Sequence, residues 1–525
     1  MQQDNCGMHT KWLETNHQIK NMKIVIVGGG TAGWIAACYY ARFNENLKNE
    51  IVVIESSKIP TIGAGEGSTG IFTKIVNNHF TKLGINEIDF LNKTSSTLKL
   101  GIRFKNWNGD DKDFLSPIQP TETTISSVDS HVLVSHILGD YFDSSASGYL
   151  MNNDYSTYSN SGSTIMGHSY HFDAQKVGEY FKEYAMKAGV KCVDTEVITL
   201  NKNKTTGELD SIETPIGNVS ADFWVDCSGF SRVLIGPMGG GWKSYSDYLP
   251  TNSAIPYIHQ YEINETPKLE TLAWAMPNGW MWQIPTQDRY GCGYVYSDKF
   301  TTYDNAVDEL IKITGRKIEP LRNIKFDCGR VETPWVKNVV AIGLAQGFVE
   351  PLEATSIHAT LIQLDFLLTN TTNFNLEKES TIFDSNINRY NEFVGRFFDD
   401  IRDLIQIHYM TDREDTPFWK YCKYEMKRTD NVKDILNICK HRSPSMLDFN
   451  FYHGSGNWGV WCWTLIGLGH LTKEVAKNTL KAYNNTDEQI LNTFNGIKNR
   501  NFKNSIRCMS SKDFMKTLLN KKLGK

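Results

Sequence analysis

Three glycines near the start of the chain follow a spacing that is typical of dinucleotide-binding sites. Gly28, Gly30 and Gly33 form a Gly-x-Gly-x-x-Gly pattern that follows an apolar run at 23–27 and opens a helix-forming stretch. The first glycine permits a tight turn, the second lets backbone approach a pyrophosphate, and the third allows close helix–strand packing. Glu55 ends the next apolar run, where a carboxylate accepts hydrogen bonds from a ribose hydroxyl. The pattern predicts a dinucleotide site without distinguishing FAD from NAD.

Two further glycine-containing segments are candidate ligand contacts. Three glycines within residues 63–67 indicate backbone that passes close to a ligand, although a flexible loop explains them nearly as well. Gly343 begins a turn before a predicted helix, and Pro351 is compatible with the entrance of that helix. The apolar stripe of this helix consists of Ile357, Leu361, Leu364 and Leu368. Its N-terminus is suited to a flavin carbonyl or a halide, but an ordinary core helix explains the segment equally well.

Two charged residues and a pair of tryptophans are ambiguous when taken singly. The alternation at 98–104 places Lys99 opposite the apolar side chains, and that pattern alone favours a solvated lysine. Glu353 alone is typical of a surface or capping carboxylate. Trp280 and Trp282 share one face of a predicted strand, where core packing is the simplest explanation.

The elements around these residues predict an α/β fold. The strand at 23–27, the following helix and the strand at 51–55 form a βαβ unit. Further strands are expected at 97–107, 190–197, 221–229, 280–285 and 338–344. A helix is expected at 171–189 with Asp173 as its N-cap, and the pattern becomes largely helical after Pro351. We therefore expect a doubly wound nucleotide-binding module with β-sheet insertions, packed against a mainly helical module.

The composition excludes several classes of function. The 525 residues include 55 basic and 59 acidic side chains, and a net charge of −4 argues against a nucleic-acid or anionic-membrane partner. We find neither a run of roughly 18–20 apolar residues nor a secretory signal. The ten cysteines have no metal-ligand spacing, so we expect no metal site and reduced thiols in a cytoplasmic protein.

Taken together, the segments resemble the flavin-dependent halogenases of the tryptophan halogenase family, from about Lys23 to the C-terminal region. The matching segments are GGGTAGW, ESSKIPTIGAGEGST, LKLGIRFKNW, HSYHFDA, DFWVDCSG, GWMWQIP, GCGYVYS, FVEPLEATSI and REDTPFW. GWMWQIP beside the glycine fingerprint is highly specific for this family. An aromatic hydroxylase is expected to carry Gly-Asp near residue 343, whereas this chain has Gly-Leu-Ala, which favours a halogenase.

The resemblance implies that FAD arrives as FADH2 from a separate flavin reductase and that O2 and chloride, bromide or iodide are consumed. It implies that the halide becomes hypohalous acid near the backbone of Thr355 and Ser356, and that Lys99 passes electrophilic halogen to an aromatic carbon. Glu353 would stabilise the cationic ring and help its proton leave. The implied flavin-binding residues are Gly28, Gly30, Thr31, Ala32, Gly33, Trp34, Glu55, Gly65, Glu66, Val197, Gly229, Gly343 and Ile357. The implied substrate or tunnel residues are Phe104, Trp280, Trp282, Pro351, Trp458 and Trp461.

The same resemblance suggests module boundaries and a homodimer. Residues 1–22 would be a loose leader, and 23–110 and 166–375 would form the flavin-binding module. Residues 111–165 would be an insertion that contributes to the substrate module, which is completed by 376–525.

Three departures from the family pattern bear on substrate and halide. Ala354 stands where familiar members have serine, and Ser356 stands where they have glycine, which leaves the preferred halide open. The segment at 451–461 lacks the glutamate and Phe-Trp pair that bind free tryptophan. We therefore expect an electron-rich, indole-type substrate that need not be free tryptophan. An FAD-dependent hydroxylase and a flavin-binding protein without halogenating activity remain the alternatives.

Overall fold

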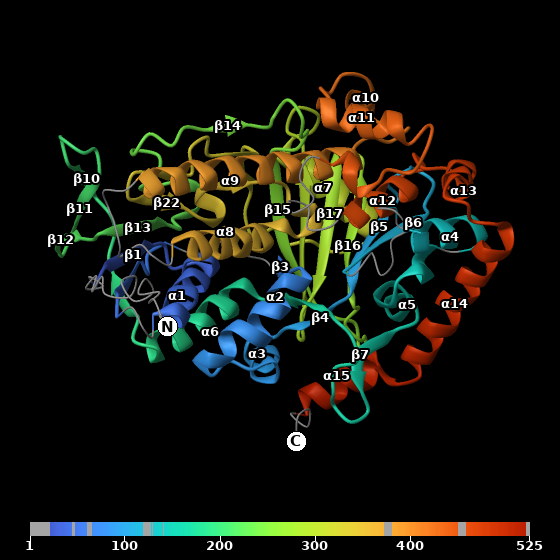
Figure 1. The fold of residues 1–525 in the computed structure, drawn as a ribbon, viewed down its shortest axis with the longest axis horizontal. Helices are drawn as coiled ribbons and strands as arrows, with labels where there is room; N and C mark the ends of the chain where they lie inside the picture. The colour runs from blue at the N-terminus through green and yellow to red at the C-terminus, as the bar shows by residue number, and fades with distance from the viewer. Residues whose placement is uncertain are drawn as a thin grey trace, which may run out of the picture.

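The computed structural model describes residues 21–44, 48–59, 66–118, 128, 130–139, 141–371, 381–449 and 458–520. The predicted leader lies almost entirely outside these ranges. Figure 1 shows a nucleotide-binding part around β1 and β13 at one side, a large sheet in the centre, and a helical layer around α4 and α14 at the other side. The long helices α8 (Thr355–Thr371) and α9 (Thr381–His408) pack on each other and run across the molecule.

A six-stranded sheet of order β21-β22-β13-β1-β2-β9 forms the nucleotide-binding part. All its pairings are parallel except β21 with β22. The strands are β1 (Lys23–Val27), β2 (Glu50–Glu55), β9 (Lys191–Asp194), β13 (Phe223–Asp226), β21 (Trp335–Val336) and β22 (Val339–Ala341). The chain therefore forms the predicted βαβ unit, with α1 (Thr31–Phe43) between β1 and β2.

The two faces of this sheet are covered by different kinds of structure. Ile24 and Ile26 belong to the core that includes α1, which packs against α6 (Ala174–Lys187). Val25 and Val27 belong to a second core, which Leu209 of β11 (Leu209–Thr214) joins. The sheet of β10 (Thr199–Lys202), β11 and β12 (Gly217–Ser220) thus supplies a predicted β-sheet insertion.

A seven-stranded sheet of order β19-β15-β18-β17-β16-β5-β6 occupies the centre of the molecule. Its strands are β5 (Gly101–Lys105), β6 (Asp113–Pro117), β15 (Ser253–His259), β16 (Glu270–Met276), β17 (Gly279–Pro285), β18 (Tyr290–Tyr296) and β19 (Ile324–Lys325). The sheet is antiparallel apart from the β5–β16 pair.

The single strand predicted at 97–107 is wrong, because two strands in different sheets share this segment. β4 (Thr97–Lys99) pairs with β8 (Ser169–Phe172), which also pairs with β3 (Glu66–Gly67), whereas β5 belongs to the central sheet. The break is at Leu100, whose N–H donates to the Leu269 carbonyl at 2.7 Å and whose carbonyl accepts from the Ile118 N–H at 2.7 Å. Lys99 therefore lies at the junction of two sheets.

The helical layer combines two distant parts of the chain. Helix α4 (Ser130–Leu138) packs against α13 (Lys473–Ala482) and α14 (Asp487–Ser505), and β7 (Tyr155–Ser159) pairs with β24 (Cys508–Ser510). Figure 1 places α4, α13 and α14 next to one another. The module boundaries themselves stay a prediction.

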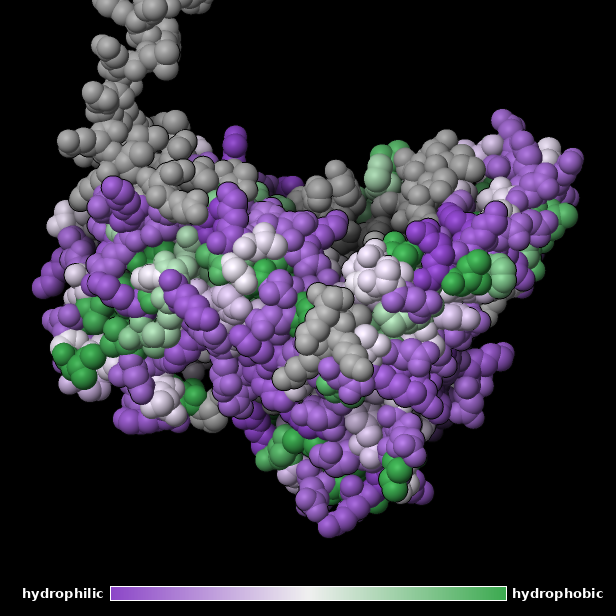
Figure 2. All heavy atoms as spheres, turned by 90° about the horizontal axis from the view of Figure 1, so that it is seen from below, coloured by the Kyte–Doolittle hydropathy of each residue, from purple (hydrophilic) through white to green (hydrophobic). Residues whose placement is uncertain are grey.

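The remaining helices and strands connect these layers. They are α2 (Gly70–Lys74), α3 (Glu87–Lys93), α5 (Ala146–Asn152), α7 (Tyr303–Thr314), α10 (Pro417–Tyr424), α11 (Asp430–Ile438), α12 (Trp458–Gly467), α15 (Ser511–Leu519), β14 (Lys243–Ser244), β20 (Gly329–Arg330) and β23 (Gly347–Phe348). Among the described helices, none has the length and apolar character to cross a membrane. The face in Figure 2 is mainly hydrophilic, with hydrophobic residues scattered over it.

Candidate active site

The turn between β1 and α1 is built as the glycine fingerprint predicts. Gly28 has φ +119°, and a Cβ there would lie 2.2 Å from the Cys227 carbonyl oxygen. A Cβ on Gly33 would lie 1.9 Å from the Gly28 oxygen, so both glycines are required by packing. A Cβ on Gly30 would meet no atom within 4 Å, and no side chain caps α1 there. Open space beside uncapped helix N–H groups fits the pyrophosphate of FAD.

Glu55 lies beside this turn at the end of β2 and is held from two sides. Its Oε2 accepts from the Trp34 indole N–H at 3.2 Å, and its Oε1 accepts from the Lys182 ammonium. A Cβ on Gly29 would lie 2.0 Å from the same Oε2, so the carboxylate packs directly on the glycine turn. Trp34 and Lys182 therefore orient the predicted ribose acceptor. Nothing in the sequence pattern distinguishes Lys182 from the other polar residues of α6.

Other predicted flavin contacts lie at the same edge of the sheet, where the carboxyl ends of parallel strands meet. Gly229 follows β13 with φ +67°, and a Cβ there would meet no atom within 4 Å. Gly343 follows β22 with φ +66°, and a Cβ there would lie 2.8 Å from that of Ala32. Ile357 is buried in the first turn of α8. The hydroxyl of Thr31, by contrast, makes a contact within the protein, because it donates to the Ala174 carbonyl at 3.2 Å.

The remaining predicted flavin contacts are Val197, Glu66 and Gly65. Val197 follows β9 and packs against the second core. Glu66 is half-buried, and burial, with a smaller effect of Asp173, raises its pKa to about 7. Gly65 lies outside the described residues.

A buried aspartate that sequence reasoning missed shapes the turn at Gly229. Asp226 is fully buried, and its Oδ2 accepts from the backbone N–H groups of Leu234 and Ile235 at 2.9 and 2.8 Å. Its Oδ1 accepts from the Ser228 N–H at 3.0 Å. An ionised carboxylate offers about four acceptor positions, so one aspartate can bind several backbone N–H groups of the turn at once. The DCSG sequence, which begins at the last residue of a buried strand, was the available signal.

Lys99 is buried, so the solvated position that alternation favoured is wrong. Only 1% of its surface is exposed, because the junction between β4 and β5 encloses it. A Cβ on Gly67 would lie 3.0 Å from the Lys99 Nζ, so the neighbouring glycine makes room for this side chain. The ammonium makes no hydrogen bond or ion pair with any residue the structure describes. Such a group is costly to bury, which indicates function more than stability.

The electrostatic surroundings of Lys99 make it a readily deprotonated amine. Burial lowers the pKa of Lys99 to about 8, and the Glu353 carboxylate opposes this shift. The neighbouring His171 is buried, and its Nε2 contacts the Thr271 hydroxyl at 2.9 Å. Burial, followed by the charge of Lys99, holds the pKa of His171 well below its usual range. A neutral imidazole and an easily deprotonated lysine thus share this region.

Glu353 occupies a constrained position immediately before α8. It ends the short helical turn Pro351–Glu353 and is 8% exposed. The next residue, Ala354, adopts a left-handed conformation with φ +54°, which is strained for a residue with a Cβ. The Glu353 Oε1 lies 3.0 Å from the Nε2 of His408, a contact whose angles are not those of a hydrogen bond. Pro351, a predicted substrate-side residue, is exposed.

The predicted halide residues begin α8. Thr355 is buried and Ser356 is half-buried. The backbone N–H groups of a first helical turn favour an anion. This position follows Glu353 directly, so a predicted anion site and a predicted catalytic carboxylate are adjacent along the chain.

The tryptophan pair of β17 is bonded to the segment that carries Glu353. The Trp280 indole N–H donates to the Glu350 Oε2 at 2.9 Å, and the Tyr409 hydroxyl donates to the same oxygen. Glu350 is fully buried, and burial raises its pKa although these two donors oppose the shift. The rings of Trp280 and Trp282 are 6.3 Å apart, which agrees with the predicted shared face. Glu350 was missed, although it lies in the quoted FVEPLEATSI segment.

Phe104 and Trp461, two of the predicted substrate residues, are fully buried. Phe104 stacks on Phe114 at 4.6 Å between ring centres and lies 4.9 Å from the His408 ring. The Trp461 ring lies 5.2 Å from that of Phe449, and its indole N–H has no hydrogen-bond partner among the described residues. The side chain of Trp458 and residues 451–457 lie outside the described part of the chain.

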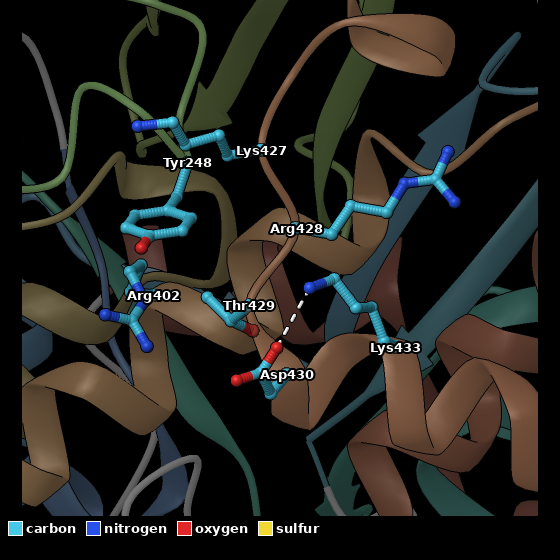
Figure 3. A pocket seen from close by; sticks show the side chains of 7 residues that line it. All are labelled: Tyr248, Arg402, Lys427, Arg428, Thr429, Asp430 and Lys433. Atoms are coloured by element: carbon cyan, nitrogen blue, oxygen red, sulfur yellow. Dashed lines mark hydrogen bonds and ion pairs between the residues drawn. The ribbon is translucent and has the colours of Figure 1, made fainter.

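A pocket of about 520 Å³, shown in Figure 3, has none of the predicted site residues in its lining. It is lined by Tyr248, Arg402, Lys427, Arg428, Thr429, Asp430 and Lys433. Lys433 pairs with Asp430 at 2.9 Å, as the dashed line in Figure 3 marks, and Arg402 pairs with Asp403 at 2.8 Å. Lys427 also pairs with Asp247 at 2.6 Å, and Arg428 donates to the Lys423 carbonyl at 2.7 Å. Because these cations already have partners in the protein, we assign the pocket no ligand.

Comparisons with known proteins give one consistent result. The family model described as tryptophan halogenase matches residues 23–484. The tryptophan 7-halogenase RebH of Lentzea aerocolonigenes is 31% identical over 527 aligned residues, which cover 91% of this chain and 95% of that protein. The tryptophan 6-halogenase ThaL of Streptomyces albogriseolus is also 31% identical, with coverage of 82% and 85%. The flavin-dependent halogenase Xcc4156 from Xanthomonas campestris is 26% identical with a TM-score of 0.83 and coverage of 95% and 98%.

Proposed function

Because this chain belongs to the tryptophan halogenase family and is thus a flavin-dependent halogenase, we propose that it halogenates an electron-rich aromatic ring by way of Lys99. The observation that carries this proposal is the buried Lys99 ammonium, whose pKa is lowered to about 8 and which interacts with the Glu353 charge. A lysine and a carboxylate that interact in a buried site form a reasonable pair for delivering an electrophile and removing a proton.

The glycine turn and the strand ends provide the residues that would hold FAD. The first N–H groups of α1 would bind the pyrophosphate, and Glu55 would accept from the ribose. Gly229 and Gly343 would leave space at the carboxyl edge of the sheet. When bound in its reduced form, this cofactor would react with O2 and supply the oxidising power that converts halide to hypohalous acid. A separate flavin reductase as its source and a homodimer stay predictions.

Lys99 has two chemically reasonable ways to use hypohalous acid. The ammonium can donate a hydrogen bond to the acid and orient it toward the ring. Alternatively, the neutral amine takes the halogen, forms an N–halogen bond and releases water. The aromatic carbon then takes the halogen from nitrogen, and the amine regains a proton. With a pKa of about 8, about a tenth of the lysines would be neutral at pH 7.

Glu353 and the tryptophan pair would have separate roles in the same reaction. The Glu353 carboxylate would stabilise the cationic ring and accept the ring proton as the carbon–halogen bond forms. Trp280, held by Glu350 at 2.9 Å, and Trp282 would keep the substrate from direct contact with the flavin. That separation would prevent hydroxylation from competing with halogenation. Thr355 and Ser356 would hold the halide through backbone N–H groups.

The substrate we propose is an indole-type ring that need not be free tryptophan. The departure at 451–461 from the family's amino-acid-binding pattern supports this, and Trp461 offers a buried indole N–H without a partner among the described residues. An electron-rich ring is required because the halogen is delivered as an electrophile.

A mass-spectrometric screen tests the proposal. The protein would be mixed with FAD, a flavin reductase, NADH and a panel of indoles and phenols, with chloride, bromide or iodide in turn. We expect halide-specific mass shifts that vanish in Lys99→Ala and persist in Lys105→Ala, which alters a half-buried lysine of β5. An oxygen-atom shift without halogen would indicate a hydroxylase. Bound flavin with no product from any ring would contradict the proposal.

A further inference from the structure

Glu350 joins three parts of the fold through its side chain. It is fully buried and lies directly before the turn Pro351–Glu353. Its Oε2 accepts from the Trp280 indole N–H of β17 at 2.9 Å and from the hydroxyl of Tyr409, the residue that follows α9. Both donor side chains are themselves buried. One carboxyl group therefore fastens the start of this turn to the central sheet and to the end of a long helix.

The hydrogen bond that closes the turn does not attach it to the rest of the protein. The Ala354 N–H donates to the Pro351 carbonyl at 3.1 Å, and both residues belong to the turn or its cap. Leu352 is buried, but apolar packing is not directional. Ala354 nevertheless has φ +54°, a conformation that persists only where the surroundings enforce it. The directional hydrogen bonds of Glu350 act directly beside this strained turn, which carries Glu353.

The Glu350 carboxyl group is costly to bury. Burial raises its pKa, and the hydrogen bonds from Tyr409 and Trp280 oppose that shift. Its Oε1 is buried without a hydrogen-bond partner among the described residues. A buried polar atom that is left unpaired destabilises the folded state, whereas an apolar side chain of similar size would avoid this cost. The position that the carboxyl group imposes on its neighbours therefore explains its presence better than stability does.

We propose that Glu350 is a positioning residue that holds the Pro351–Glu353 turn and keeps the Glu353 carboxylate within electrostatic reach of Lys99. Its consequence for catalysis rests on the proposed function, but the position of Glu353 is a property of the protein without cofactor or substrate. The charge of Glu353 acts on Lys99 and opposes the lowering of the Lys99 pKa by burial. If the turn loosens, this charge moves away from the lysine. The pKa of Lys99 therefore reports the position of the turn.

The pKa of Lys99 can be measured without turnover. Protein labelled with ¹³C-lysine would be titrated by NMR, with the Lys99 signal assigned from its absence in Lys99→Met. In Glu350→Leu, which removes the acceptor, we expect the pKa of Lys99 to fall below about 8, in the same direction as in Glu353→Gln. In Glu350→Gln, whose amide oxygen can accept from both donors, we expect it to stay at about 8. The titration of His171 does not overlap, because its pKa is held well below its usual range.

Glu309→Leu is the matched control. Glu309 of α7 accepts from the Tyr294 hydroxyl and from the Asn278 side-chain amide at 2.8 Å, so this variant also removes a carboxylate that a tyrosine and a nitrogen donor hold. We expect Glu309→Leu to lower stability and to leave the pKa of Lys99 at about 8. An equal fall in Glu309→Leu would show that general loosening of the fold is the cause, and it would overturn the inference.

Ring halogenation provides a second readout. In Glu350→Leu we expect kcat for ring halogenation to fall on the order of 10²-fold while hypohalous acid formation persists, because the base that removes the ring proton is misplaced. KM for the aromatic substrate should change much less than kcat. Glu350→Gln should recover most of the lost rate, because it restores the acceptor for both donors.

The inference and the proposed function fail in different ways. A folded Glu350→Leu with an unchanged pKa of Lys99 would overturn the role of Glu350 and leave the proposed function intact. If the unaltered protein halogenates no ring, the proposed function fails, but the titration still decides whether Glu350 positions Glu353. If Glu350→Leu does not fold, the double variant Trp280→Phe with Tyr409→Phe removes both donors instead. We expect the same fall in the pKa of Lys99 there, and an unchanged value would overturn the inference.

Discussion

At the scale of single residues, the site is defined by charges that the fold buries without neutralising. Lys99 and Glu353 are both enclosed, yet they form no ion pair within contact distance. A buried charge without a hydrogen-bonded partner destabilises the folded state. Ala354 adds backbone strain at the same place, with φ +54° between Glu353 and α8. Strain and unpaired charge together are typical of a site where function has overridden stability.

Removing the Lys99 charge should therefore stabilise the protein. The pKa of Lys99 falls from an ordinary 10.5 to about 8 through burial, so Lys99→Met should raise the free energy of unfolding at pH 7 by about 3 kcal/mol. Between pH 8 and 10.5 the unfolded chain still binds the proton that the folded chain has lost, so the unaltered protein gains stability as the pH rises. The difference in the free energy of unfolding between Lys99→Met and the unaltered protein should consequently shrink between pH 8 and 10.5.

Denaturant unfolding at a series of pH values measures this effect. Lys105→Met serves as the control, because Lys105 is half-buried above the Trp274 ring and pays no comparable burial cost. A Lys99→Met protein that is less stable than the unaltered one at pH 7 would contradict the account of a strained, buried ammonium.

At the scale of elements, the site depends on how short strands and helix ends are held together. Strand β4, which ends at Lys99, is paired to β8, and the half-buried carboxylate of Glu87 holds β8 to α3. Glu87 of α3 accepts from Tyr170 and contacts His168, each at 2.6 Å. Burial raises the pKa of Glu87, but His168 and Tyr170 outweigh it and lower the value to about 2.

This network should make stability sensitive to acid. A carboxylate whose pKa is lowered by folding stabilises the folded state at any pH above the pKa that it has in the unfolded chain. This contribution to stability disappears as the pH falls from 4.5 to about 2. Glu87→Gln should lower the free energy of unfolding by about 3 kcal/mol at pH 7 and have no effect near pH 2. Unfolding followed by circular dichroism tests this. Glu183→Gln, at an exposed ion pair, should change little, and an equal loss there would refute the assignment.

At the scale of the whole molecule, local sequence patterns predicted the helices and strands of the nucleotide-binding part better than the surroundings of the site residues. The glycine fingerprint and the strand-helix periodicity correctly predicted β1, α1 and β2, and Asp173 caps α6 as expected. The alternation at 98–104 gave the wrong environment for Lys99, because the chain changes sheets at Leu100 and buries both faces. Period-two alternation assumes one solvated face, and that assumption fails where two sheets meet.

The residues that orient the site were missed because their partners are distant in sequence. Lys182 binds Glu55 across 127 positions, and Tyr409 binds Glu350 across 59. No local pattern encodes such pairs. Only the likeness of separated motifs to one family indicated that Lys99 and Glu353 act together, which their electrostatic coupling supports.

The central claim is that Lys99 transfers halogen and does not produce the oxidant. The most direct measurement compares two products of Lys99→Met under identical reduced-flavin supply: hypohalous acid, caught by a small-molecule trap, and halogenated aromatic ring. The account predicts normal trap halogenation and a loss of ring product on the order of 10²-fold, in a protein at least as stable as the unaltered one. Ring halogenation at the unaltered rate would contradict it.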